Sequence, residues 1–321
     1  MFFDRSKMNV KSLRERINDL DVNVIQPVTP LKSYHKSMEK VALRVVEAKK
    51  NKNSIIMIIG GHVIRSVVQR YIIYLLEKGY ISCLSMNGSC IIHDFELSLI
   101  GATTENVARY IKEGQFGLWE ETGQINEIVN RAYKNGGMGM GKAIGKAIYE
   151  GDFPHKEISL LAACYRLNIP STVHVGIGYD ITHQHSNFDG AAAGSLSYMD
   201  FLQFTKIVSN LEGGVIMNFG SSVMAPEVFL KALSMARNVA HQQGKFIKHF
   251  TTLVCDLHEL PDDFNKEPPK DSPAYYFRPW KTMLIRTVND GGKSYYIKGK
   301  HSETVPALWS AINIEEEKMR N

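Results

Sequence analysis

Short, almost wholly apolar runs alternate along this chain with longer segments in which apolar residues recur at helical spacing. The apolar runs span residues 54–59, 80–86, 171–175, 214–217 and 247–254. The helical segments span residues 41–49, 63–78, 155–167, 199–211 and 227–237. Runs without a polar face are typical of parallel strands buried on both sides, and their alternation with helices indicates βαβ units. The sequence therefore predicts an α/β fold with a mostly parallel sheet.

The same order of elements predicts one large Rossmann-like domain with helices on both faces of its sheet. A chain of 321 residues can form one large or two ordinary domains. Residues 261–273 are rich in Pro, Asp and Lys and are a predicted surface loop, and no stretch has the composition of a linker. We therefore expect a polar N-terminal arm over residues 1–40 and a single α/β domain over residues 41–321.

Charge and cysteine usage exclude several classes of protein. The net charge of +5 comes from scattered basic residues, so nucleic-acid binding is not expected. Four cysteines without a CxxC pair argue against a disulfide framework and favour a reducing compartment. Neither a signal peptide nor an apolar run of about 18 residues is present. We expect a cytoplasmic protein that does not enter a membrane.

Two of the predicted strands end in polar, glycine-rich turns. Residues 171–185 form a dense polar loop around the end of one strand, and residues 218–222 form a small-residue turn after another. Ligands of open α/β sheets bind in the crevice at the carboxyl ends of the strands. A binding site is therefore expected between these two strand ends.

Small residues recur at three predicted strand ends, although a GxGxxG fingerprint is missing. The three groups are Gly60 and Gly61, then Asn87, Gly88 and Ser89, and finally Gly220, Ser221 and Ser222. Backbone N–H groups beside such residues can approach a pyrophosphate or a ribose. A single glycine after a strand is more often a simple turn, but three such ends predict a cofactor crevice. His62 and Arg65 either add positive charge there or lie on the surface of a helix.

Residues 136–142 match the GxxxxGK spacing of a phosphate-binding loop. That chemistry needs a Ser or Thr after the lysine to hold magnesium, and a strand before the loop. Here Ala143 follows the lysine, and the preceding residues 127–134 have a helical pattern. A connection between two helices is the favoured interpretation.

A group of potential metal ligands lies in the polar loop: His174, His183, His185, Asp180 and Asp189. Histidine and carboxylate are good ligands for zinc or iron. The two closest histidines are only two residues apart in an irregular loop, without the HExxH spacing of a helical site. Hydrogen-bonding and substrate-contacting roles are favoured, and no metal is expected.

Several of these motifs resemble those of deoxyhypusine synthases over most of the chain, from about Ile55 to Trp309. The similar positions are residues 85–95, the Ile169-Pro170 pair leading to Asp180, the turn 220–222 with 236–238, the eight-residue spacing from Pro273 to Lys281, and Pro306. The resemblance implies an NAD-dependent enzyme. It also implies transfer of an aminobutyl group from a polyamine such as spermidine to a protein lysine or a small diamine.

The resemblance further implies site residues and an assembly. Lys281 would be the catalytic residue that carries the alkylamine as an imine, and Asp180, Glu227, Trp280 and His93 would bind the substrate. The three small-residue turns would bind NAD, and the protein would be a homotetramer with shared active sites. The motifs also depart from the family, because His93 replaces a glutamate, Pro226 a histidine and Lys300 an aspartate. These departures leave a catalytically silent NAD- or polyamine-binding homologue as the alternative.

The residues around Lys281 permit the implied chemistry on physical grounds. The lysine follows an aromatic stretch that contains Tyr275 and Trp280, and precedes a predicted strand. A lysine desolvated by aromatic rings beside a cation such as Arg278 can act as a free amine nucleophile. The alternative is an ordinary edge-strand lysine whose alkyl chain lies over Trp280.

Overall fold

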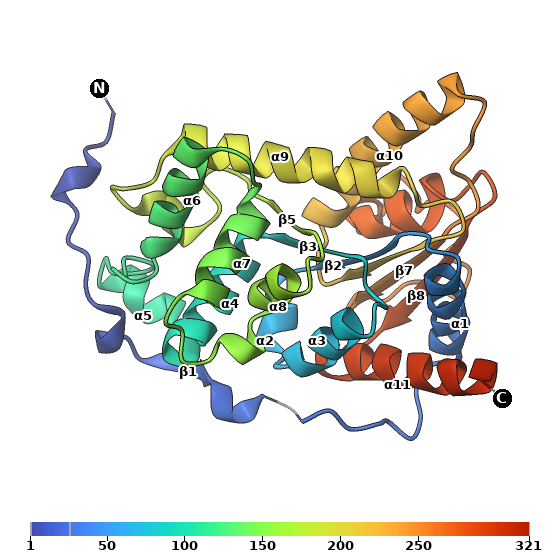
Figure 1. The fold of residues 1–321 in the computed structure, drawn as a ribbon, viewed down its shortest axis with the longest axis horizontal. Coiled ribbons are helices and arrows are strands. Elements are labelled where there is room, and N and C mark those ends of the chain that lie inside the picture. The colour runs from blue at the N-terminus through green and yellow to red at the C-terminus, as the bar shows by residue number, and fades with distance from the viewer. Residues whose placement is uncertain (1, 26, 321) are drawn as a thin grey trace.

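The core of the computed structural model, which describes residues 2–25 and 27–320, is a six-stranded parallel sheet (Figure 1). Its strand order is β5-β3-β2-β6-β7-β8. The strands are β2 (Ile55–Ile59), β3 (Cys83–Asn87), β5 (Ser171–His174), β6 (Val215–Phe219), β7 (Thr251–Asp256) and β8 (Lys293–Lys298). The chain builds outward from β2 in one direction and then from β6 in the other. This is the doubly wound Rossmann order, so the predicted fold class is confirmed.

Strand β2 shows why these residues form the centre of the sheet. Its side chains alternate between two cores, because successive strand residues point to opposite faces. Ile55, Met57 and Ile59 pack into one hydrophobic cluster, and Ile56 and Ile58 pack into the other. All five are buried. Both faces of the sheet are therefore covered by helices, as Figure 1 shows.

Helices connect the strands and surround the sheet. They are α1 (Lys36–Lys50), α2 (Gly61–Arg65), α3 (Gln69–Glu77), α4 (Gly88–Ile100), α5 (Val107–Lys112), α6 (Gln124–Asn135), α7 (Met140–Glu150), α8 (Leu160–Arg166), α9 (Gly190–Val208), α10 (Met224–Gln242) and α11 (His301–Arg320). The predicted helix over residues 63–78 is broken into α2 and α3, because Val67 has a left-handed φ of 56°. Within the described residues, no helix has the length and apolarity needed to cross a membrane.

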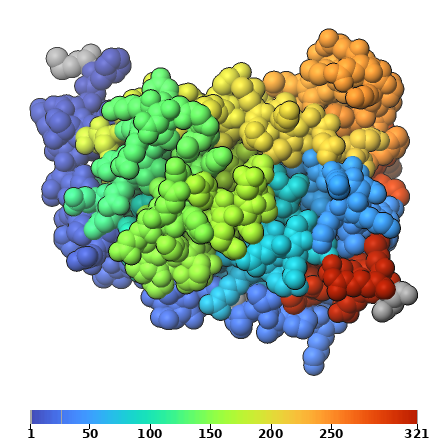
Figure 2. All heavy atoms as spheres, in the orientation of Figure 1, coloured from blue at the N-terminus to red at the C-terminus, as the bar shows by residue number. Residues whose placement is uncertain are grey.

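The N-terminal arm follows the outside of the domain, along one side and the lower edge in Figures 1 and 2. Its strand β1 (Asn18–Asp21) pairs antiparallel with β4 (Ala102–Glu105) in a separate two-stranded sheet. Helix α1 begins at Lys36, so the last five residues of the predicted arm are helical. The arm is a packed part of the domain.

The segment around Lys281 differs from its prediction. A strand was expected after the lysine, but residues Trp280–Arg286 form a π-helix that begins directly after Pro279. Proline is favoured at helix starts because it lacks the N–H that would otherwise go unbonded. The Met283 carbonyl accepts a hydrogen bond from Thr252 of β7 at 2.9 Å. The apolar residues of this segment therefore face the sheet from a helix, and the last strand, β8, forms further along the chain.

Candidate functional site

The point where the strand order reverses lies between β2 and β6, and the backbones of the two following turns touch there. A Cβ atom on Gly60 would overlap the carbonyl oxygen of Gly220. Gly220 has a φ of +65°, a conformation that side chains with a Cβ rarely adopt. The Gly60 N–H donates to the Phe219 carbonyl at 2.9 Å. Both glycines are therefore required by a close approach at the switch point, where ligands of this fold bind.

The small-residue turn after β3, which contains Asn87, Gly88 and Ser89, lies beside the turn after β2. A Cβ on Gly61 would overlap the Ser89 hydroxyl, and one on Gly88 would overlap the Asp180 carboxylate. The Asn87 side chain caps α4 by accepting from the Cys90 N–H at 3.3 Å. The structure thus brings together all three turns that the sequence predicts as a cofactor crevice, together with Asp180.

A cavity of about 520 Å³ opens beside Gly220 at this edge of the sheet. It is lined by Leu20, His62, Arg65, Ser66, Val67, Gly220, Ser222, Asp256, Leu257, Lys300, His301 and Ser302. Asp256 accepts a hydrogen bond from the Ser222 hydroxyl at 3.0 Å. The buried His301 Nδ1 has no hydrogen-bond partner among the described residues. The lining holds two cations, Arg65 and Lys300, and one carboxylate, Asp256. The cavity therefore favours an anionic group.

A second cavity of about 260 Å³ lies next to the first, since Arg65 lines both. Its lining includes Ser89, His93, Thr104, Glu105 and Asp180, with Arg16 and Glu96 at its base. The Asp180 side chain is only 10% exposed, and this burial raises the pKa of its carboxyl to about 6. Burial likewise lowers the pKa of His93 to about 4.

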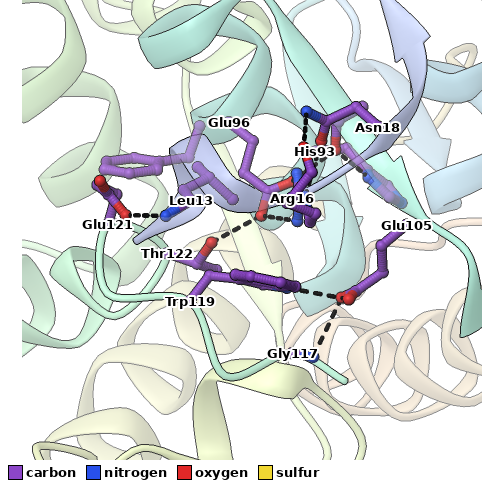
Figure 3. Close-up of polar contacts among 12 residues, drawn as sticks. Leu13, Arg16, Asn18, His93, Glu96, Glu105, Gly117, Trp119, Glu121 and Thr122 are labelled. Carbon is purple, nitrogen blue, oxygen red and sulfur yellow. Dashed lines mark hydrogen bonds and ion pairs between the residues drawn. The ribbon is translucent and has the colours of Figure 1, made fainter. Parts of the chain in front are cut away.

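Arg16 of the N-terminal arm and Glu96 of α4, which both line this second cavity, form a buried ion pair (Figure 3). Arg16 donates two hydrogen bonds to Glu96, at 2.9 and 2.7 Å, and both side chains are 1% exposed. Glu96 also accepts from the hydroxyls of Thr103 and Thr122, each at 2.7 Å. The Thr103 oxygen lies 2.9 Å from His93 Nδ1. The arm is therefore connected to the cavity by a chain of hydrogen bonds.

The residues predicted around Lys281 are not brought to these cavities. Neither Lys281, Trp280 nor Glu227 lines either of them. Lys281 is buried, with its amino group 3.5 Å from the centre of the Tyr275 ring. The Trp280 indole donates to the Phe264 carbonyl at 2.8 Å.

Glu227 lies in the first turn of α10 and pairs with two cations, Lys231 and Arg278. The hydrogen bonds from Lys231 and Arg278 lower the pKa of its carboxyl. Glu227 therefore has local partners of its own, and its predicted contact with a polyamine stays a prediction.

The residues considered above as a phosphate-binding loop and as metal ligands have other roles in the structure. Residues 136–139 connect α6 to α7 and residues 140–142 form the start of α7, which confirms a helix–helix connection there. His174, His183 and His185 bond to Thr172, to backbone N–H groups and to the Gly117 carbonyl respectively. Across residues 2–25 and 27–320, no three His, Cys, Asp or Glu side chains are arranged to hold a metal ion.

Sequence reasoning missed several residues of the crevice. Asp256, His301 and Thr104 were not singled out, and Glu96 was passed over beside His93. Asp256 is the last residue of β7, so its place at a strand end was an available signal. Thr104 lacked any signal, because its left-handed φ of 69° appears only in the structure.

No protein-family model matches this sequence, and no curated protein matches it. Solved structures share its fold. A LOR/SDH-type protein from Methanococcus maripaludis S2 aligns with 90% of this chain and 72% of its own, at 14% identity and a TM-score of 0.52. The complex of AgrE with ornithine and NAD+ aligns with 90% of this chain and 34% of its own, at 14% identity and a TM-score of 0.51.

This chain therefore spans about a third of the length of AgrE. A protein from Entamoeba histolytica assigned as a deoxyhypusine synthase aligns with 87% of this chain and 88% of its own, at 8% identity and a TM-score of 0.46. At these identities the likeness to AgrE and to the LOR/SDH-type protein establishes a related fold.

Proposed function

We propose that this chain is an NAD-dependent enzyme whose cofactor lies across the crevice between β2 and β6. The observation that carries the proposal is the contact between Gly60 and Gly220 at the reversal of strand order. Such contacts let the backbone come close to a dinucleotide. The likeness in fold to AgrE, solved with NAD+, supports this choice of cofactor.

The residues at the crevice fit a dinucleotide. Arg65 and Lys300 in the larger cavity would face its phosphates. Ser221 and Ser222 complete the turn after β6. When bound, NAD would supply a hydride acceptor for substrate oxidation. The protein's own part is to bind the phosphates and to hold the substrate in the smaller cavity.

The cofactor proposal is tested with a matched pair of glycine variants. Gly220→Val should weaken NAD binding at least about tenfold, because the new side chain overlaps His301. Gly244→Val is the control, since Gly244 has a similar φ of +68° but no neighbour within 4 Å of a Cβ. Isothermal titration with NAD measures both affinities. Equal affinities for the two variants would place the cofactor elsewhere.

The finer proposal is that the substrate is an amine and the reaction transfers an alkylamine through Lys281. The motif resemblance to deoxyhypusine synthases supports it, and so does the buried position of Lys281 against Tyr275. The substrate amine would give up a hydride from carbon, for which NAD would be the acceptor, and become an iminium ion. Attack by the Lys281 amine would expel the departing amine and leave the alkyl group bound as a lysine imine.

Borohydride tests this step, because it reduces an imine to a stable amine. Incubation with spermidine and NAD should leave an alkylamine on Lys281, detectable by mass spectrometry, and Lys281→Ala should abolish the adduct while retaining NAD binding. An adduct on another lysine would contradict the role of Lys281. NAD binding without any adduct would instead favour a catalytically silent NAD- or polyamine-binding homologue.

Since Lys281 lines neither cavity, we propose that transfer takes place in a site shared between two copies of the chain. We propose the homotetramer that the resemblance implies, in which each interface is self-complementary. Inactive Lys281→Ala and Gly220→Val variants should then complement each other after subunit exchange, because a hybrid pair contains one intact site. A monomer at working concentration would contradict the shared site.

A further inference from the structure

We infer that His93 is held as the tautomer protonated on Nδ1, so that its Nε2 is a hydrogen-bond acceptor facing the 260 Å³ cavity. We infer further that this cavity receives the N–H groups of an amine. Arg16, Glu96 and Thr103 act as positioning residues for this histidine. The tautomer follows from the structure alone, and only the identity of the ligand rests on the proposed function.

The tautomer follows by elimination along the chain of hydrogen bonds. Arg16 donates to both oxygens of Glu96, so that carboxylate is ionised and can only accept. The Thr103 hydroxyl therefore gives its single hydrogen to Glu96. Its oxygen, 2.9 Å from the His93 ring, must then accept from Nδ1–H. A neutral ring protonated on Nδ1 carries a bare Nε2.

The other side of the ring faces the cofactor crevice. His93 Nε2 makes no hydrogen bond within the described residues, and it is not among their enclosed, unpartnered atoms. The neighbouring Cδ2 lies 3.4 Å from the position of a Cβ on Gly61. The acceptor therefore lies where a bound substrate would meet the turn after β2.

Burial keeps this ring neutral, since it lowers the pKa of His93 to about 4. Arg65, Arg16 and His62 act in the same direction, and Glu96 opposes them. Removing a proton from an alkylammonium group with a pKa of about 10 would then be unfavourable by about six orders of magnitude. His93 is therefore assigned as a binding residue that accepts a hydrogen bond, and not as the base.

The rest of the cavity presents a carboxylate from Asp180 together with the cation of Arg65. Thr104 also lies in its wall and holds a left-handed φ of 69°, and such strained backbone positions cluster at ligand sites. An ammonium group carries three donors and no acceptor. It is the functional group that matches Asp180 and a bare His93 Nε2.

Nitrogen NMR of protein labelled with ¹⁵N-histidine tests the tautomer directly at pH 7. His93 should show a protonated Nδ1 and a bare Nε2, with the resonances assigned by their loss in His93→Gln. Thr103→Val removes the acceptor and should raise the share of Nε2–H at least about tenfold. Thr104→Val is the matched control and should leave the tautomer unchanged. A wild-type proton on Nε2, or no change in Thr103→Val, overturns the assignment.

The ligand class is tested on the same sample with two probes of opposite chemistry. Spermidine offers only donors and should shift the bare Nε2 resonance, whereas glutarate offers only acceptors and should not. A shift with glutarate alone, or with neither probe, overturns the amine assignment. NAD affinity is measured separately by titration, so its absence would contradict the proposed function without altering the tautomer result.

Discussion

Glu96 and Asp180 line the same cavity, yet they have opposite surroundings. Glu96 receives two hydrogen bonds from Arg16 and one from each of two threonines. The Asp180 side chain is 10% exposed, and the basic group that lies near it is His183 Nε2, 3.7 Å away. Burial lowers the pKa of His183, so this ring is a neutral neighbour at pH 7. Removing one partner of a fully paired buried charge leaves an uncompensated charge, whereas a buried charge without a cation is available to a ligand. The first carboxylate anchors the arm, and the second is the candidate ligand contact.

The largest effect is expected from Arg16→Met. Removing the cation leaves Glu96 buried and uncompensated, which costs about 3–5 kcal/mol of the free energy of unfolding. Urea denaturation at neutral pH measures the loss. The double variant Arg16→Met/Glu96→Leu should recover most of it, because no buried charge remains. A loss below about 1 kcal/mol in the single variant would show that Glu96 is not anchored by Arg16.

Asp180→Asn should increase the free energy of unfolding, and this increase should depend on pH. The pKa of Asp180 is about 6 in the folded state against 3.8 for an unperturbed aspartate, so the folded state binds more protons between these values. Its stabilising contribution is present below pH 4 and is lost as the pH rises through 6. The rise of about two pKa units corresponds to about 3 kcal/mol.

Denaturation of Asp180→Asn and wild type at pH 4.5 and pH 8 measures this dependence. The variant should be more stable at pH 8 by up to about 3 kcal/mol, and the advantage should shrink at pH 4.5. A pH-independent difference would mean that Asp180 has a compensating cation, and the comparison with Glu96 would fail.

The smallest effect is expected at the surface, where Arg286 and Glu267 repeat the two-bonded geometry of Arg16 and Glu96. Their bonds are 2.6 and 2.9 Å long, but both side chains are 42% exposed. Glu267→Gln should therefore change the free energy of unfolding by less than about 1 kcal/mol. A change as large as that of Arg16→Met would show that geometry, and not burial, sets the strength of these pairs.

The crevice itself was predictable from local pattern. Apolar runs without a polar face predict parallel strands, and the carboxyl ends of parallel strands share one edge of the sheet. The turns at Gly60, Asn87 and Gly220 could therefore be assigned to one site before any contact was known. The helix around Lys281 could not, because short apolar segments suit either a strand or a helix.

By itself, the sequence determined the fold class, the strands that build the sheet and the small residues that line its carboxyl edge, because these depend on patterns repeated within a few residues. Only the tertiary structure decided which carboxylate is paired. Arg16 and Glu96 are 80 residues apart in the chain, and Asp180 meets Gly88 across an even longer separation. Burial and pairing arise from such distant contacts, and they alone distinguish an anchoring charge from one open to a ligand.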